Sequence, residues 1–178
     1  MDFVNTPKKT TESLLLRKIR RMILLFMVLL VLSGITAFPV QTELHWMMQY
    51  AGSLPDTLAQ WLALITAAVD DTAGKYPYLI YGYDWLAYAH IIIALFFTGV
   101  YRDPIRNAWV LRIGMIACAG VFVLAFSCAQ IRGIPLFWTL VDCSFGFFGI
   151  IPLIIVQRWI NQLENIHVQK FTNSPHTL

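Results

Sequence analysis

Charged residues are what this sequence has least of. Lysine, arginine, aspartate and glutamate together make up 13% of its 178 residues, whereas 58% of the residues are hydrophobic. Soluble domains carry roughly 25% charged residues, so this composition excludes an ordinary soluble domain. The mean hydropathy of +0.63 and several long apolar runs indicate an integral membrane protein instead. A chain of this length has room for a single membrane domain, residues 1–178.

Cysteine is scarce, and histidine is almost missing from the apolar runs. Cys118, Cys128 and Cys143 all lie in apolar stretches without CxxC spacing, which excludes a disulfide framework and a typical structural zinc site. A haem with two histidine ligands needs two intramembrane histidines, and only His90 qualifies. We expect no metal and no cofactor. A zinc or copper site made of His90, Asp142 and Cys128 is the weaker alternative.

Four apolar segments are long enough to cross a hydrocarbon layer about 30 Å thick. The predicted spans cover about residues 22–40, 83–101, 108–130 and 136–157. A retained first span is favoured over a cleaved signal peptide, because Phe38-Pro39 is a poor cleavage context. No internal repeat is evident, which disfavours a transporter built from inverted halves. The predicted fold class is therefore all-α, an integral membrane four-helix bundle.

The segment between the first two spans, residues 42–74, has an amphipathic pattern. Residues 42–50 can form a short helix capped by Thr42, and Pro55 suits the first turn of a second one. Apolar residues then recur at helical spacing: Leu58, Trp61, Leu62, Ile65 and Val69. We expect one or two short amphipathic helices on the outer side. Near their end, Asp70 and Asp71 are expected to be solvated, or to face a cation or a basic partner.

The basic residues are distributed unevenly along the chain. If both termini are cytoplasmic, 11 of the 13 lysines and arginines lie on cytoplasmic segments, and only Lys75 and Arg132 lie outside. This is a strong positive-inside bias. It accounts for the pI of about 8.8 without a nucleic-acid partner. We therefore expect a multi-pass protein of the cell membrane, of the bacterial inner-membrane type, whose partner is the lipid bilayer.

The fourth predicted span contains an acid, Asp142, well inside its apolar run. An ionisable group at that depth is costly, so it marks a functional or packing site. At 100° per residue, one face of this span carries Trp138, Asp142, Gly146, Gly149 and Leu153. The third span has a similar stripe of mostly small residues: Gly114, Ala117, Cys118, Val121, Ala125 and Cys128. Such stripes predict helix faces that pack closely on a neighbouring helix.

His90 lies on the second span at about the same depth as Asp142, so the two side chains are candidates for a polar pair. Their contact would be either an interhelical hydrogen bond that fixes packing or a catalytic pair in which the carboxylate orients the imidazole. The candidate catalytic residues are thus His90 and Asp142. The candidate ligand-binding residues around them are Asp84, Trp138, Cys128 and Arg132.

Two stretches, YGYDWLAYAHIIIALFFTGVYRDPIRN and IRGIPLFWTLVDCSFGFFGIIPL, resemble an uncharacterised group of bacterial multi-pass membrane proteins over residues 82–157. This resemblance implies no activity. A looser likeness links the chain to the EXPERA group of sterol isomerases and the sigma-2 receptor, which use intramembrane acids around a lipid-like ligand in four spans. The corresponding residues would be Glu43, Asp84 or His90, and Asp142, although the first span here has no acid. The likeness implies an architecture only.

Three functions fit these patterns. The first is a small accessory or scaffold membrane protein without catalytic activity, whose His/Asp pair holds the helices together and whose partners are other membrane subunits. The alternative is a binder or converter of a small lipophilic molecule, in which His90 exchanges a proton by isomerase-like chemistry. A proton or ion pathway ranks third, because one histidine and two acids in the outer half make a poor relay.

Overall fold

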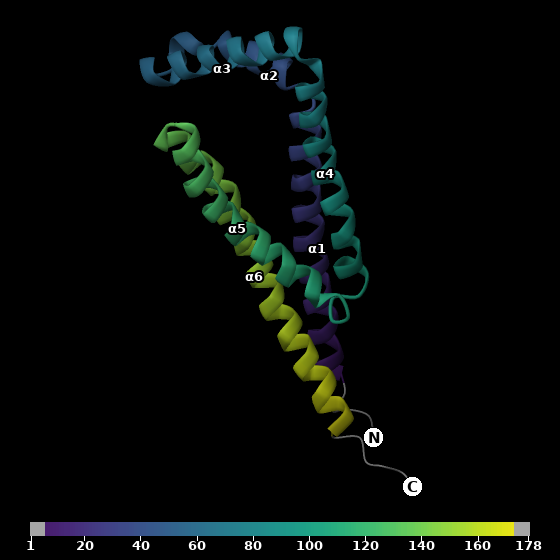
Figure 1. Cartoon of the computed structure of the whole chain (residues 1–178). Helices are drawn as coiled ribbons and strands as arrows, with labels where there is room; N and C mark the ends of the chain where they lie inside the picture. Colours follow the sequence, from purple (N-terminus) through teal and green to yellow (C-terminus); the bar gives the residue numbers. More distant parts are fainter. Residues whose placement is uncertain (1–5, 173–178) are drawn as a thin grey trace. The chain divides into compact units, whose positions relative to one another are not determined.

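The computed structural model describes residues 6–172, and the regular structure in that range is entirely helical (Figure 1). Six α-helices and one 3-10 turn are found there, with no strand, which confirms the predicted all-α class. Their bounds are α1 Thr6–Ala37, α2 Val40–Met48, η1 Ala51–Ser53, α3 Asp56–Lys75, α4 Pro77–Arg102, α5 Ala108–Arg132 and α6 Leu136–Thr172.

Four of these helices are long and apolar enough to cross a membrane: residues 10–37 of α1, all of α4, all of α5, and residues 136–169 of α6. The chain is thus compatible with a membrane protein of four transmembrane helices. The predicted second, third and fourth spans lie inside α4, α5 and α6. Helix α4 begins six residues before its predicted span, and α6 continues past Gln157 to Thr172.

The junction between α1 and α2 differs from the prediction. The chain leaves α1 after Ala37, and α2 begins at Val40 with Pro39 as its N-cap residue. The backbone N–H of Glu43 donates to the Pro39 carbonyl at 2.9 Å, so the predicted cap, Thr42, lies inside the helix. Proline has no N–H and cannot continue α1, which makes Pro39 the point where one helix ends and the next starts.

The chain divides into two compact units, which we describe separately. The α5–α6 unit comprises residues 1–27 and 96–178, and the α2–α3 unit comprises residues 28–95. Helices α1 and α4 therefore contribute one part to each unit.

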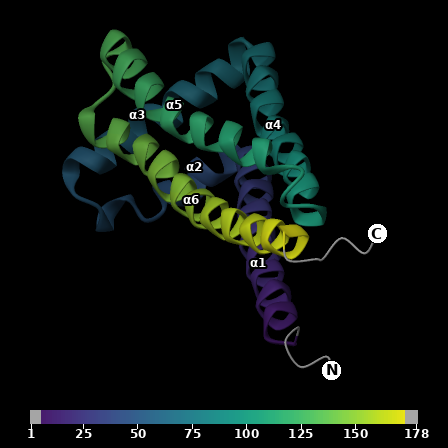
Figure 2. The same cartoon turned by 90° about the horizontal axis from the view of Figure 1, so that it is seen from below.

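In the α5–α6 unit, α5 and α6 form an antiparallel hairpin whose two helices lie side by side in both views (Figures 1 and 2). Gly133 follows α5 with φ of 65°, the left-handed conformation that glycine adopts without steric cost. The N–H of Ile134 then donates to the Ala129 carbonyl at 2.9 Å, as in a Schellman motif. The tight turn after α5 is thus built by Gly133.

Small residues close the seam between α5 and α6, as the sequence predicts. A Cβ atom on Gly146 would lie 2.7 Å from the Cys118 carbonyl oxygen, and one on Gly149 would lie 3.1 Å from the Cys118 sulfur. A Cβ atom on Gly114 would lie 3.0 Å from Leu153. At Gly146 only glycine allows the backbone to approach the Cys118 carbonyl this closely, and these contacts confirm the predicted packing stripes.

Beyond this seam, larger aliphatic side chains form the core of the α5–α6 unit. On α6 the fully or almost fully buried residues recur every three or four positions: Leu153, Val156, Ile160 and Leu163. Ile19 and Ile23 of α1 and Leu111 of α5 are equally buried, and the rings of Phe26 and Phe97 lie 4.9 Å apart. This core extends α6 as an amphipathic helix well past the predicted span.

The α2–α3 unit contains two helix–helix contacts, one between α2 and α3 and one between α1 and α4. Helix α2 packs against α3, where Leu44, Leu62 and Thr66 are buried. The part of α1 in this unit approaches α4 at Gly34, where a Cβ atom would lie 2.7 Å from the Ala87 carbonyl oxygen. The residues predicted to form outer amphipathic helices are therefore helical, as α2 and α3.

Candidate functional site

A hollow of about 300 Å³ opens in the α5–α6 unit next to the hairpin turn. Four residues singled out from the sequence line it: Cys128 and Arg132 of α5, and Trp138 and Asp142 of α6. The remaining lining residues are apolar: Val121, Leu124, Ala125, Ala129 and Ile134. This site, which we call the α5–α6 hollow, therefore combines an apolar wall with one acid and one base.

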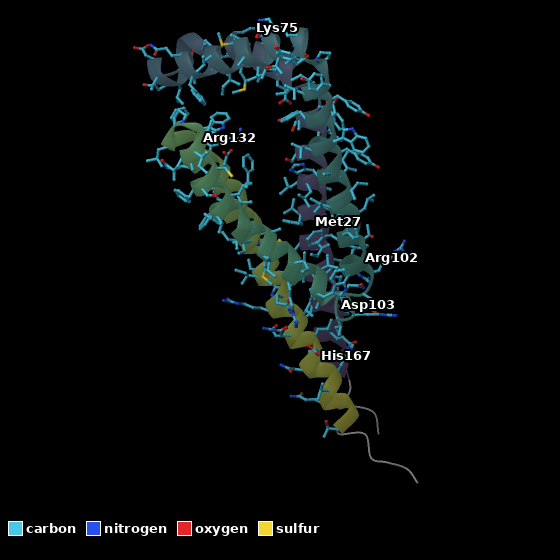
Figure 3. The ribbon with its side chains drawn as sticks, in the orientation of Figure 1. Met27, Lys75, Arg102, Asp103, Arg132 and His167 are labelled. Atoms are coloured by element: carbon cyan, nitrogen blue, oxygen red, sulfur yellow. The ribbon has the colours of Figure 1, made fainter. Side chains whose placement is uncertain are left out.

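Helical spacing explains why these residues share the hollow. Ala125, Cys128 and Arg132 are separated by three and four positions, so they lie on one face of α5. Trp138 and Asp142 are four residues apart and share a face of α6. The turn at Gly133 folds the two helices back on one another and brings the two faces together. Figure 3 shows Arg132 at the turn end of the hairpin.

The two charged groups of the hollow lie at different depths. Arg132 is the last residue of α5 and is exposed, whereas Asp142 is half-buried. Asp142 lies six residues after the start of α6, about 9 Å along the helix axis. Within the described part of this unit, neither side chain forms an ion pair or a hydrogen bond. An acid inside a membrane helix is normally paired with another polar group. The Asp142 carboxyl group is therefore a hydrogen-bonding group of the hollow that lacks a partner within the described part of this unit.

The thiols near the hollow are free. Cys128 lines it and receives only a long contact from the Ser127 hydroxyl, 4.0 Å from oxygen to sulfur. Cys143 is buried and Cys118 half-buried, and the three cysteines are not joined in a disulfide. Between residues 6 and 172 no three His, Cys, Asp or Glu side chains are grouped in a way that could hold a metal ion.

His90 and Asp84 lie on α4, in the α2–α3 unit. The Nδ1 atom of His90 is 2.9 Å from the Leu86 carbonyl oxygen, one helical turn earlier. A carbonyl only accepts, so Nδ1 carries the proton in this bond, and Nε2 of the neutral ring is left as an acceptor. Asp84 is half-buried near the start of α4. Because His90 and Asp142 belong to different units, their predicted pairing stays a prediction.

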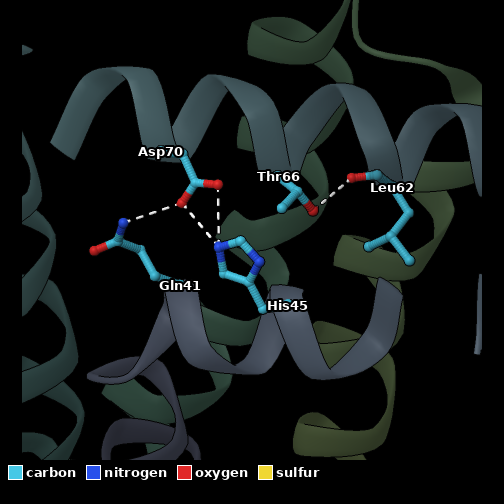
Figure 4. A network of polar contacts seen from close by, with 5 residues as sticks. All are labelled: Gln41, His45, Leu62, Thr66 and Asp70. Carbon is cyan, nitrogen blue, oxygen red and sulfur yellow. Dashed lines mark hydrogen bonds and ion pairs between the residues drawn. The ribbon is translucent and has the colours of Figure 1, made fainter. Parts of the chain in front are cut away.

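A polar network between α2 and α3 was not predicted in this form (Figure 4). His45 Nε2 lies 3.1 Å from both carboxylate oxygens of Asp70, and the Gln41 amide donates to Asp70 at 3.1 Å. The Gln41 hydrogen bond, followed by that of His45, lowers the pKa of Asp70 below its ordinary value of 3.8. Asp70 and Asp71 were expected to be solvated or to face a cation or a basic partner. Asp70 faces a basic side chain of the same chain, His45. Gln41 and His45 are four residues apart and share a face of α2, and this spacing was the sequence signal that could have indicated the network.

The beginning of α1 and the end of α6 are joined by a second contact that the sequence did not indicate. His167 Nε2 lies 3.0 Å from a carboxylate oxygen of Glu12. Both residues belong to the α5–α6 unit, although they are 155 positions apart in the chain. Figure 3 shows His167 toward the end of α6 that lies away from Arg132. The contact places the described ends of α1 and α6 at the same end of this unit.

Comparisons with known proteins leave this site without a template. No protein-family model matches the chain, and neither a curated protein nor a solved structure matches it.

Proposed function

We propose that this protein is a multi-pass membrane protein that binds one small lipophilic molecule in the α5–α6 hollow. The observation that supports this most strongly is the composition of the hollow. Four of the six residues predicted to form a site line it together, and its acid, Asp142, has no partner within the unit. Apolar pockets with a few convergent polar groups are the usual form of small-molecule sites.

The chemistry of the lining defines the class of ligand. The apolar wall suits a hydrocarbon body, and Trp138 adds a large flat surface. Asp142 would accept a hydrogen bond from a hydroxyl or amine, while the exposed Arg132 would hold a carbonyl or acidic group at the mouth. A volume of about 300 Å³ lies at the lower end of the range for small-molecule sites, so the bound part is small.

In the membrane, we propose a four-helix bundle with both chain ends on the cytoplasmic side of a bacterial inner membrane. The distribution of basic residues supports this orientation. The contact between Glu12 and His167 also supports it, because it holds the ends of α1 and α6 together. The α5–α6 hollow, at the other end of α6, would then open toward the outer leaflet.

His90 and Asp84 would take part only if α4 lines the same site. In that arrangement the acceptor nitrogen of His90 would take a proton from one position of the ligand and return it at another, Asp142 would stabilise the charged ring in between, and Asp84 would lie at the mouth. The protein would then be a converter of its ligand as well as a binder. This step rests on the binding proposal.

A second candidate is the accessory or scaffold function, and one observation favours it. Gly120 of α5 is exposed, and nothing lies within 4 Å of the position that its Cβ would take. Glycine on an open membrane-helix surface permits close approach of another helix. Another membrane subunit would pack on this surface of α5, and Asp142 would serve as a hydrogen-bond acceptor for it.

Native mass spectrometry of the protein in mild detergent separates these functions. Wild type, Asp142→Asn and the control Asp56→Asn are purified in parallel; Asp56 is an exposed acid in the first turn of α3. Ligand binding predicts one discrete lipophilic mass per chain in wild type and control, and its loss from Asp142→Asn. Bulk phospholipid alone in all three samples would refute the proposal, and an additional protein mass would favour the accessory function.

A further inference from the structure

Six arginines gather in the α5–α6 unit around the loop between α4 and α5, far from the hairpin turn. They come from α1, the end of α4, the following loop, α5 and α6: Arg20, Arg21, Arg102, Arg106, Arg112 and Arg158. All six side chains are exposed. We call this group the arginine belt. It is independent of the proposed ligand site, which lies at the other end of α5.

Two contacts place members of the belt near one another. Arg20 Nε donates to the Tyr101 carbonyl at 3.2 Å, and its guanidinium lies 5.9 Å from the centroid of the Tyr101 ring. This fixes α1 beside Arg102, which Figure 3 shows at the end of α4. On the hairpin, Gly114 faces Leu153. Because α5 and α6 are antiparallel, residues 112 and 158 both lie beyond that contact, within about 8 Å along the axis.

The belt has almost no counter-charge of its own. None of the six arginines forms an ion pair within the described part of the unit. The one acid in the adjoining loop, Asp103, accepts a hydrogen bond from the backbone N–H of Arg106 at 3.1 Å. Lys75, on the α2–α3 unit, is different, because its ammonium lies 2.7 Å from an Asp71 carboxylate oxygen. The belt is therefore a concentrated, uncompensated positive charge.

The position of the belt indicates what compensates it. Arg102 ends one candidate membrane span, and Arg112 lies in the first turns of the next, where helices leave the hydrocarbon layer. Phosphate groups of phospholipids occupy that level. The planar guanidinium matches a phosphate with two parallel hydrogen bonds, and Arg20 is already oriented by Tyr101. An acidic protein would contact only one side of the unit. These arginines come from every helix in it, which fits lipid headgroups that surround the unit better than a single protein partner.

We propose that the arginine belt binds the phosphate groups of anionic phospholipids, with Arg20 as its most ordered member. Basic residues next to an anionic leaflet each contribute a measurable attraction, and the sum selects anionic over zwitterionic lipid. The protein would thus carry a shell of anionic lipid on the side to which both chain ends are assigned. This selection would act whether or not the hollow is occupied.

The test is a lipid competition with the full-length protein in mild detergent. Equal amounts of phosphatidylglycerol and phosphatidylcholine are added, and the lipids retained on the protein are counted by native mass spectrometry. Wild type should retain mainly phosphatidylglycerol. Arg20→Gln should lower the ratio about fivefold, and Arg20→Lys, which keeps the charge, should lower it less. Arg158→Gln provides a second variant, because the Arg158 side chain has no bond to lose within the described residues of the unit.

Lys75→Gln is the matched control, since it removes one positive charge that is already paired. The ratio should be unchanged in this variant. Equal retention of the two lipids by wild type, or an equal loss in Lys75→Gln and in both arginine variants, would overturn the proposal. Displacement of phosphatidylglycerol by inorganic phosphate at the same concentration would also overturn it, in favour of a site for free anions. Retention of phosphatidylglycerol in the presence of phosphate, together with loss in the arginine variants, is the result we expect.

Discussion

Gly146→Ala should separate α5 from α6 at the centre of their seam. The added methyl group would lie 2.7 Å from the Cys118 carbonyl oxygen, 3.1 Å from Phe122 and 3.2 Å from Val121. Non-bonded heavy atoms prefer roughly 3.5–4.0 Å, and a backbone carbonyl of a helix cannot rotate away. The two helices must therefore move apart by several tenths of an ångström. Overpacking of this kind typically costs about 1–3 kcal/mol.

Gly120→Ala is a matched control for this change. Both glycines lie inside helices of the same hairpin, but nothing lies within 4 Å of the position of a Cβ atom on Gly120. The gain in helix propensity from glycine to alanine is common to both variants, so it cancels when the two are compared. The difference in unfolding free energy between them then reports the packing term alone.

The assay is equilibrium unfolding in increasing amounts of a denaturing detergent, followed by circular dichroism. We expect Gly146→Ala to unfold at a lower concentration than wild type, and Gly120→Ala to unfold at the wild-type concentration or slightly above it. Alkylation of Cys118, whose sulfur lies next to Gly149, should also become faster in Gly146→Ala. Equal midpoints for the two variants would refute the close-packed seam.

Three further changes test other contacts. Gly34→Ala should lower the thermal midpoint, because its methyl group would lie 2.7 Å from the Ala87 carbonyl oxygen; an unchanged midpoint would contradict the contact. The pKa of Asp70 is lowered in the folded state, so its contribution to stability is present above pH 3.8 and lost as the pH falls through the lowered value. In Asp70→Asn the free energy of unfolding should therefore fall less steeply than in wild type as the pH is lowered below 3.8. The same pH dependence as in wild type would count against the network. Glu12→Gln removes the negative charge from a partly exposed contact with His167 that is worth less than about 1 kcal/mol. It should speed tryptic cleavage near the end of α6, and an unchanged rate would mean that the pair does not hold α6.

Sequence reasoning identified the elements and one packed interface well. The four candidate membrane helices follow from hydropathy, because a bilayer requires long apolar segments. The hairpin turn follows from Gly133, and the α5–α6 seam follows from small residues placed every three or four positions on both helices. That same periodicity put Trp138 and Asp142 on one face of α6, so two of the four hollow residues named from the sequence could be placed together in advance.

What the sequence could not provide depends on contacts between distant segments. Glu12 and His167 are paired only because α1 and α6 end together, and no local pattern encodes that. The partner of Asp70 required knowing that α2 folds back on α3. The start of α2 was misplaced because Thr42 is a good N-cap residue in general, whereas the missing N–H of Pro39 determined the actual boundary.

The most direct test of the central claim is the alkylation rate of Cys128 by N-ethylmaleimide, measured by peptide mass spectrometry. Cys128 lines the α5–α6 hollow, and buried Cys143 serves as an internal reference. Protein purified in mild detergent is compared with the same protein after prolonged exchange into fresh detergent, which removes lipophilic ligands. A bound ligand predicts slow alkylation of Cys128 before the exchange and faster alkylation after it, with Cys143 unreactive throughout. Equal rates for Cys128 in the two samples would contradict an occupied hollow.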